Sequence, residues 1–239
     1  IPQAQATTQP VIYQAHNLFN PYLGYGTFVM PAIIMVIIQQ TMLIGIGMIG
    51  GTWREFGLYH KLCPAGRRRM STLPIVTGRA LVYASVYVVT CAYVLGVHYR
   101  LFNYPTNGST WTLVLFLSAY MAACLALSIA VSTLFRYREN SLLLLLWTSI
   151  PLLMLSGVSY PREGIPDWLY NFGQIFPSSH GVNGFIRIRT MGASLQEVFA
   201  EIKALCILTV IYGGLACIGT HLAIDREERR REREAARKG

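Results

Sequence analysis

The chain contains five long apolar stretches, separated by polar and basic segments. They cover residues 28–50, 80–97, 111–134, 142–158 and 204–224, and none contains Asp, Glu, Lys or Arg. A helix needs about 20 mostly apolar residues to cross the ~30 Å hydrocarbon core of a bilayer. Each stretch is of that order, so the pattern predicts an all-α polytopic membrane protein with five transmembrane helices.

The composition supports this interpretation. Of the 239 residues, 53% are hydrophobic and only 13% are charged, whereas a soluble domain carries about 25% charged residues. The five cysteines show no metal-ligand spacing, and a disulfide framework is not expected. We expect an external segment over residues 1–26, a transmembrane domain over residues 27–224 and a charged cytoplasmic tail over residues 225–239.

The distribution of charge predicts the orientation. Basic residues select the side of the membrane during insertion, and three quarters of the 20 Lys and Arg lie after the first stretch, after the third stretch or in the tail. This places the N-terminus outside and the C-terminus in the cytoplasm of a bacterial inner (plasma) membrane. A nucleic-acid partner is not expected. Trp147 lies inside the fourth stretch rather than at its edge, so it is expected to pack between helices.

The longest inner loop covers residues 51–79. Thr52 and Glu55 have the spacing of a capping box, in which a hydroxyl and a carboxylate satisfy the first turn of a helix. A short helix on the membrane surface is expected to follow and to end near residues 63–66. Two roles remain open for the arginines at residues 67–69: a topology signal in contact with anionic lipids, or a docking surface for a cytoplasmic partner.

The outer segment, residues 159–203, has a helical pattern interrupted at Pro177. We expect two short amphipathic helices that lie in the outer interface or re-enter the bilayer as a hairpin. Ser194 and Glu197 form a second capping-box spacing, which predicts the start of the last membrane helix.

Polar residues inside the stretches are few. Gln39, Gln40 and Thr41 lie in the middle of the first stretch, where an amide needs a partner. They either join helices or line a translocation path, and both roles remain open. Small residues at close spacing allow helices to approach each other; those expected to do so are Gly47, Gly51, Gly213, Gly214 and Ala216.

Enzymatic motifs are not found. The chain has no phosphate-binding loop with the Gly-x-x-x-x-Gly-Lys-Ser/Thr pattern and no His-Glu-x-x-His metal helix. His180 follows Ser178 and Ser179, but three polar residues at a helix break are more typical of a cap and a turn. An intramembrane enzyme that relies on His180 or His98 is therefore a minor alternative, and the uncharged stretches weigh against an ion-coupled transporter.

The arrangement resembles the type-2 ABC exporter permeases, of the multidrug or drug-efflux-like kind. Asn20-Pro21 before the first stretch and Arg54-Glu55 after it are similar to the family's pattern at the ends of its first span. Residues 156–166 resemble the family's outer re-entrant hairpin, and residues 176–181 resemble its proline-centred turn. The resemblance marks the outer hairpin residues as Pro161, Glu163, Pro166 and Pro177.

The resemblance implies a permease subunit without its own ATPase. A partner ABC ATP-binding subunit would bind ATP and Mg, and would dock on the first cytoplasmic loop around Arg54, Glu55, Tyr59 and Lys61. A second permease subunit, identical or homologous, would complete the path among membrane lipids. Gly57-Leu58-Tyr59-His60 departs from the family's usual glycine-threonine-x-glutamate run.

Members of the same subgroup carry an earlier span and an external domain. The chain opens with Ile1 rather than Met, so we expect it to be the C-terminal part of a longer protein, and residues 1–26 to be the end of that external domain. The sequence thus predicts the permease domain of an ATP-driven exporter that moves a drug-like, lipid or glycan substrate out of the cytoplasm. A non-transporting membrane scaffold is the alternative.

Overall fold

The computed structural model describes residues 25–62, 72–104, 106–156 and 164–236, and these residues form helices and connecting turns without a strand. Four long helices run side by side: α2 (Tyr25–Glu55), α3 (Leu73–Ala92), α5 (Thr110–Ser132) and α9 (Phe199–Ala236). The short elements are η1 (Tyr59–Leu62), η2 (Tyr93–His98), α4 (Tyr99–Leu101), α6 (Asn140–Leu155), α7 (Asp167–Gly173) and α8 (Pro177–Arg189).

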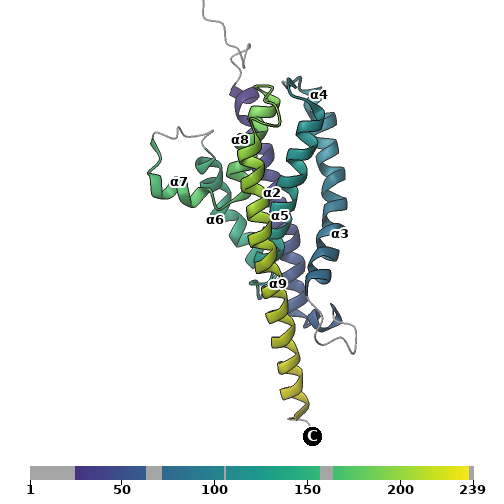
Figure 1. Cartoon of the computed structure of the whole chain (residues 1–239). Helices are drawn as coiled ribbons and strands as arrows, with labels where there is room; N and C mark the ends of the chain where they lie inside the picture. Colours follow the sequence, from purple (N-terminus) through teal and green to yellow (C-terminus); the bar gives the residue numbers. More distant parts are fainter. Residues whose placement is uncertain (1–24, 63–71, 105, 157–163, 237–239) are drawn as a thin grey trace, which may run out of the picture.

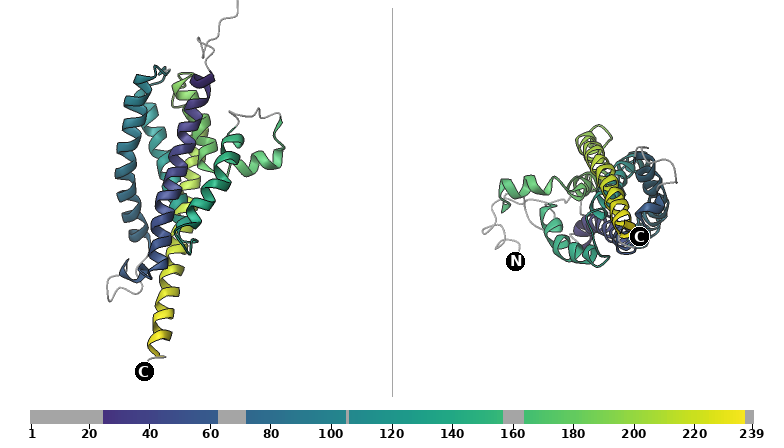
Figure 2. Two further views of the ribbon diagram at one scale, coloured as in Figure 1. Left: turned by 180° about the vertical axis from the view of Figure 1, so that it is seen from behind. Right: turned by 90° about the horizontal axis from the view of Figure 1, so that it is seen from below.

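The bundle is built around α5, which packs against α2, α8 and α9. α3 flanks this core on one side, while α6 and α7 splay away on the other side (Figures 1 and 2). η2 and α4 continue α3 without a break, and α9 extends well beyond the bundle at the end where α2 and η1 meet. We call this end the arginine-rich end, and the end with α4 the opposite end.

Four helices in the described part of the chain are long and apolar enough to cross a membrane: Val29–Glu55, Leu73–Leu101, Thr110–Ser132 and Phe199–Ala236. The fourth predicted stretch, residues 142–158, is not confirmed as a fifth span. It forms α6, whose 16 residues rise about 24 Å at 1.5 Å per residue, less than the ~30 Å of hydrocarbon. The hydroxyl of Ser156 donates to the carbonyl of Leu153 at 2.6 Å, where the helix ends.

Two expectations about this part of the chain were wrong. Trp147 does not pack between helices of this chain, because its side chain is 80% exposed on α6. The second span also begins earlier than predicted, at Leu73, so Arg79 lies inside a candidate span. Arg79 is buried near the arginine-rich end, where its guanidinium lies 5.2 Å from the ring centre of Trp53.

Close helix packing by glycine is confirmed for α2. A Cβ on Gly47 would lie 2.8 Å from Phe135 and Ser141, and one on Gly51 would lie 2.7 Å from the backbone of Arg138. In α9 the expectation holds for Ala216, which is fully buried, but it is wrong for Gly213 and Gly214. Both of these glycines face open space within 4 Å.

The outer hairpin has the two predicted helices, α7 and α8, but α8 is not a surface helix. Val182, Phe185 and Ile188 are fully buried, and α8 packs against α2, α5 and α9. Gly181 and Gly184 allow this contact, because a Cβ at either position would clash with Tyr120 or Phe116 of α5. The hairpin therefore inserts one of its helices into the bundle, while α7 projects from it (Figure 1).

The Glu197 half of the second capping box is present, but α9 begins only at Phe199, after a turn over residues 195–198. The carboxylate of Glu197 accepts hydrogen bonds from the backbone N–H and the hydroxyl of Ser194, at 2.7 and 2.8 Å. The first capping box was wrong. Thr52 lies in the last turn of α2, and its hydroxyl donates to the carbonyl of Met48 at 2.8 Å. A threonine inside a continuing helix bonds back to the previous turn instead of opening a new helix.

Candidate functional site

The chain leaves α2 at the arginine-rich end through a sharp turn. α2 ends at Glu55, Gly57 takes a φ of +62°, and η1 follows in place of the longer surface helix expected over residues 52–63. The four predicted docking residues all lie in this short segment, but they face two different ways. Arg54 and Tyr59 turn inward, and Glu55 and Lys61 are exposed.

Arg54 joins α2 to the end of α5. Its Nη1 donates to the carbonyl of Thr133 at 2.8 Å and lies 3.5 Å from the carbonyl of Phe135. The last carbonyls of a helix have no partner within it and carry partial negative charge. A guanidinium at this place satisfies them, so Arg54 holds two spans together.

Tyr59 joins the same segment to α9. Its side chain is 1% exposed and packs edge-on to Trp53, with ring centres 6.0 Å apart. Its hydroxyl donates to the carbonyl of Gly50 at 3.4 Å, and its backbone N–H donates to the carboxylate of Glu227 at 2.9 Å. Burial raises the pKa of the Tyr59 hydroxyl, which keeps it a hydrogen-bond donor.

Glu227 is the residue that sequence reasoning missed. Its carboxylate pairs with Arg231 one turn further along α9 at 3.7 Å, and its side chain is only 11% exposed. Arg231 also donates to the carbonyl of Gly57 at 3.3 Å. The extension of α9 is therefore fastened to the turn after α2, and no local pattern in the sequence signals that contact.

The exposed part of this end is a mixed surface. Glu55 and Lys61 flank Phe56, whose side chain is 64% exposed. Arg136 and Arg138, between α5 and α6, are also exposed. The arginines at 67–69 lie outside the described residues. We refer to Glu55, Phe56 and Lys61 as the exposed turn.

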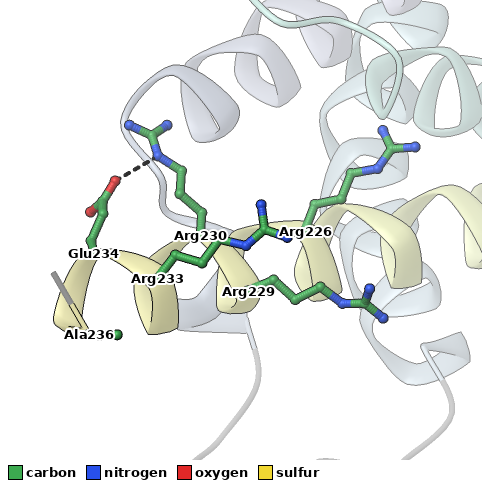
Figure 3. A pocket seen from close by; sticks show the side chains of 6 residues that line it. All are labelled: Arg226, Arg229, Arg230, Arg233, Glu234 and Ala236. Atoms are coloured by element: carbon green, nitrogen blue, oxygen red, sulfur yellow. Dashed lines mark hydrogen bonds and ion pairs between the residues drawn. The ribbon is translucent and has the colours of Figure 1, made fainter.

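The extension of α9 adds a basic surface. Arg226, Arg229, Arg230 and Arg233 project from it in different directions, and Arg230 bonds to Glu234 at 2.9 Å (Figure 3).

The three polar residues in the middle of α2 face three different neighbours. Gln39 is fully buried, and its side-chain oxygen accepts the backbone N–H of Ser178 in α8 at 2.7 Å. The amide nitrogen of Gln40 donates to Thr148 of α6 at 3.3 Å. Thr41 is exposed and bonds to the carbonyl of Ile37 in its own helix. Consecutive helical residues point about 100° apart, so the three do not line one common surface, and lining of a path stays a prediction for each.

The outer hairpin residues are only partly described. Pro161 and Glu163 lie outside the described residues, Pro166 precedes the first turn of α7, and Pro177 opens α8 and is buried. The hydroxyl of Ser179 donates to the carbonyl of Gly173 at 2.7 Å, and Nε2 of His180 lies 3.0 Å from the carbonyl of Gln174. These are the contacts of a cap and a turn. Among the described residues, no group of His, Cys, Asp and Glu could hold a metal ion.

Comparison with known proteins gives a consistent result. A family model described as "ABC-2 family transporter protein" matches residues 1–218. "Probable multidrug ABC transporter permease YbhR" of Escherichia coli K12 is 25% identical over 200 residues, which are 84% of this chain and 54% of that protein. "ABC transporter G family member 20" of Dictyostelium discoideum is 24% identical over 201 residues, which are 82% of this chain and 27% of that protein.

The chain thus spans about half the length of YbhR and a smaller part of the Dictyostelium protein. No solved structure gives a significant match.

Proposed function

The chain belongs to the ABC-2 family of transporter proteins, and on that premise we propose that it is the permease subunit of an ATP-driven exporter. The observation that carries this proposal is the family match over residues 1–218, which includes α2 to α8 and most of the apolar part of α9. The relative YbhR is named a probable multidrug permease, which favours a drug-like substrate over a lipid or a glycan.

In this proposal the arginine-rich end faces the cytoplasm, in line with the positive-inside rule. A separate ABC subunit binds ATP and Mg and docks on the exposed turn of Glu55, Phe56 and Lys61. The apolar stretches carry no Asp, Glu, Lys or Arg, and the buried Arg79 lies near the arginine-rich end of its candidate span rather than in the middle. This agrees with a driving force that comes from such a partner rather than from ions moving through the membrane.

The contacts behind the exposed turn suggest how a movement of the docked ATP-binding subunit would be transmitted to the membrane spans. Arg54 ties the end of α2 to α5, and Tyr59 with Glu227 ties η1 to α9. A displacement of the turn therefore acts on three spans at once. Rocking of these spans would alternate access between the two sides of the membrane.

A second permease subunit is part of the same proposal. α6 splays from the bundle (Figure 2) and exposes Leu143, Leu146, Trp147 and Ile150. Indole rings favour the membrane boundary, so a tryptophan in the middle of an apolar helix fits contact with protein better than contact with lipid tails. We place the second subunit on this face of α6.

Charge reversal of the exposed turn tests the docking. The full-length protein is co-expressed with its ATP-binding subunit, and the amount of that subunit that co-purifies is measured. Glu55→Lys with Lys61→Glu keeps the net charge and should lower the apparent affinity about tenfold, because two rim charges of about 0.7 kcal/mol each are reversed. Lys203→Glu, at the opposite end, is the control and should have no effect.

Equal recovery with all variants would contradict docking on the exposed turn. Failure of the wild-type protein to bind any ATP-binding subunit would favour the scaffold alternative instead.

A further inference from the structure

A groove of about 1030 Å³ runs between α3 and α5, with α9 at its floor. Its walls are aliphatic over most of their length, as with Ala84 and Val88 on α3 and Leu117 and Leu125 on α5. α3 is the least buried of the four candidate spans, because it stands away from the core along this groove. The lining extends from Leu73 to Arg100, or about 40 Å at 1.5 Å per residue.

Among the described residues, the charged part of the groove lining lies at one end. Arg100 and Arg189 line it where α4 and α8 come together, and none of the described lining residues is acidic. Arg189 is held in place, since its guanidinium lies 5.1 Å from the ring centre of Tyr99 and its Nη2 donates to the carbonyl of Leu95 at 3.2 Å. Its Nε is buried and has no hydrogen-bond partner within the described residues. Arg100 is exposed.

We infer that this groove binds a phospholipid with an anionic headgroup, such as phosphatidylglycerol. A chain that spans the membrane places the apolar part of the groove at the depth of acyl chains and the two arginines at the depth of headgroups. Guanidinium groups bind phosphate through paired, charge-assisted hydrogen bonds. The positive end of the groove therefore selects the headgroup, and its apolar length holds an acyl chain. This binding needs only a membrane-embedded chain and is independent of transport.

Two adjacent glycines of α9 provide a matched test of the groove. Gly213 lines it and Gly214 does not, and both have nothing within 4 Å of an added Cβ. Gly213→Phe should obstruct the groove where α9 lines it, whereas Gly214→Phe adds the same ring outside the lining. Purified full-length protein is stripped of lipid, incubated with equal amounts of dioleoylphosphatidylglycerol and dioleoylphosphatidylcholine, and bound lipid is counted by native mass spectrometry.

The wild-type protein should retain phosphatidylglycerol in preference to phosphatidylcholine. Gly213→Phe should lower the retained phosphatidylglycerol about tenfold, and Gly214→Phe should leave it unchanged. Arg100→Gln tests the headgroup contact and should remove most of the preference between the two lipids. Lys203→Gln, which removes an exposed charge outside the groove lining, should leave the preference intact.

Equal retention of the two lipids by the wild-type protein would overturn the inference, as would equal loss in the two glycine variants. Occupation by protein is tested separately with Gly213→Cys. A photoreactive label on that thiol should crosslink to lipid in native membranes, and a crosslink to another transmembrane helix would show that the groove holds a polypeptide.

Discussion

At the scale of single residues, polar side chains of α2 form hydrogen bonds with the ends of neighbouring helices. Arg54 satisfies the last carbonyls of α5, and Gln39 accepts the backbone N–H of Ser178 in the first turn of α8. Around the fully buried Gln39, in the middle of a candidate span, no water is present to satisfy such groups. Each contact therefore fixes the position of a helix end that would otherwise be costly to bury.

Gln39→Leu should destabilise the protein by about 1–3 kcal/mol, because it leaves the buried N–H of Ser178 without its acceptor. The measurement is the thermal unfolding of the purified protein in detergent. Thr41→Val is the control, since Thr41 is exposed and its hydroxyl donates to the carbonyls of Ile37 and Ile38 in its own helix. An equal shift of the unfolding midpoint temperature in both variants would show that the hydrogen bond of Gln39 to Ser178 does not contribute to stability beyond the effect of the control.

At the scale of elements, the insertion of α8 depends on its small residues. Gly181 and Gly184 lie against the rings of Tyr120 and Phe116, so that two helices meet with little between them except one layer of aromatic side chains. The same residue type has the opposite significance on α9, where Gly213 and Gly214 face open space. A glycine in a helix costs about 1 kcal/mol relative to alanine, and the two glycines of α8 have a packing reason for it that Gly213 and Gly214 lack.

Alanine substitution should separate these two kinds of glycine by sign. Gly181→Ala should lower the free energy of unfolding by about 1–3 kcal/mol through overpacking against Tyr120. Gly214→Ala should raise it by up to ~1 kcal/mol through helix propensity. Thermal unfolding in the same detergent compares the two variants. Stabilisation by Gly181→Ala would mean that α8 does not pack as closely as described.

At the scale of the whole molecule, the bundle has a tightly packed centre and two unpartnered sides. α5 lies in the centre, α3 borders the proposed lipid groove on one side, and α6 presents exposed aliphatic and indole groups on the other. The two sides would have different occupants, a lipid at α3 and a second permease subunit at α6. At the arginine-rich end, Arg54 links α2 to α5, and Tyr59 with Glu227 links the turn after α2 to α9.

Trp147→Ala should weaken association of two permease subunits tenfold or more, because a tryptophan at the centre of an interface commonly contributes ~2 kcal/mol or more and ~1.4 kcal/mol is a factor of ten. The fraction of dimer is measured by cysteine crosslinking in native membranes. Trp168→Ala on α7 is the matched control, since Trp168 is 72% exposed and Trp147 is 80% exposed. Unchanged crosslinking with Trp147→Ala would place the subunit contact elsewhere.

Much of the fold could be predicted from the sequence, and less of the site. Apolar length located four spans, and the Ser194–Glu197 spacing marked the turn that comes just before the last one. Predictions failed where the same local sequence pattern is compatible with two different structures. Thr52 fits both a helix start and a helix interior, and only the continuation of α2 decides between them.

The sequence by itself determined that this protein is a helical membrane protein with one basic end. Hydrocarbon requires every backbone group to bond locally, so apolar length alone is enough to specify a spanning helix. Only the tertiary structure decided which polar residues support the fold and which remain exposed for a partner. Gln39 meets Ser178 across 139 positions and Tyr59 meets Glu227 across 168 positions, and no pattern of neighbouring residues encodes partners that far apart.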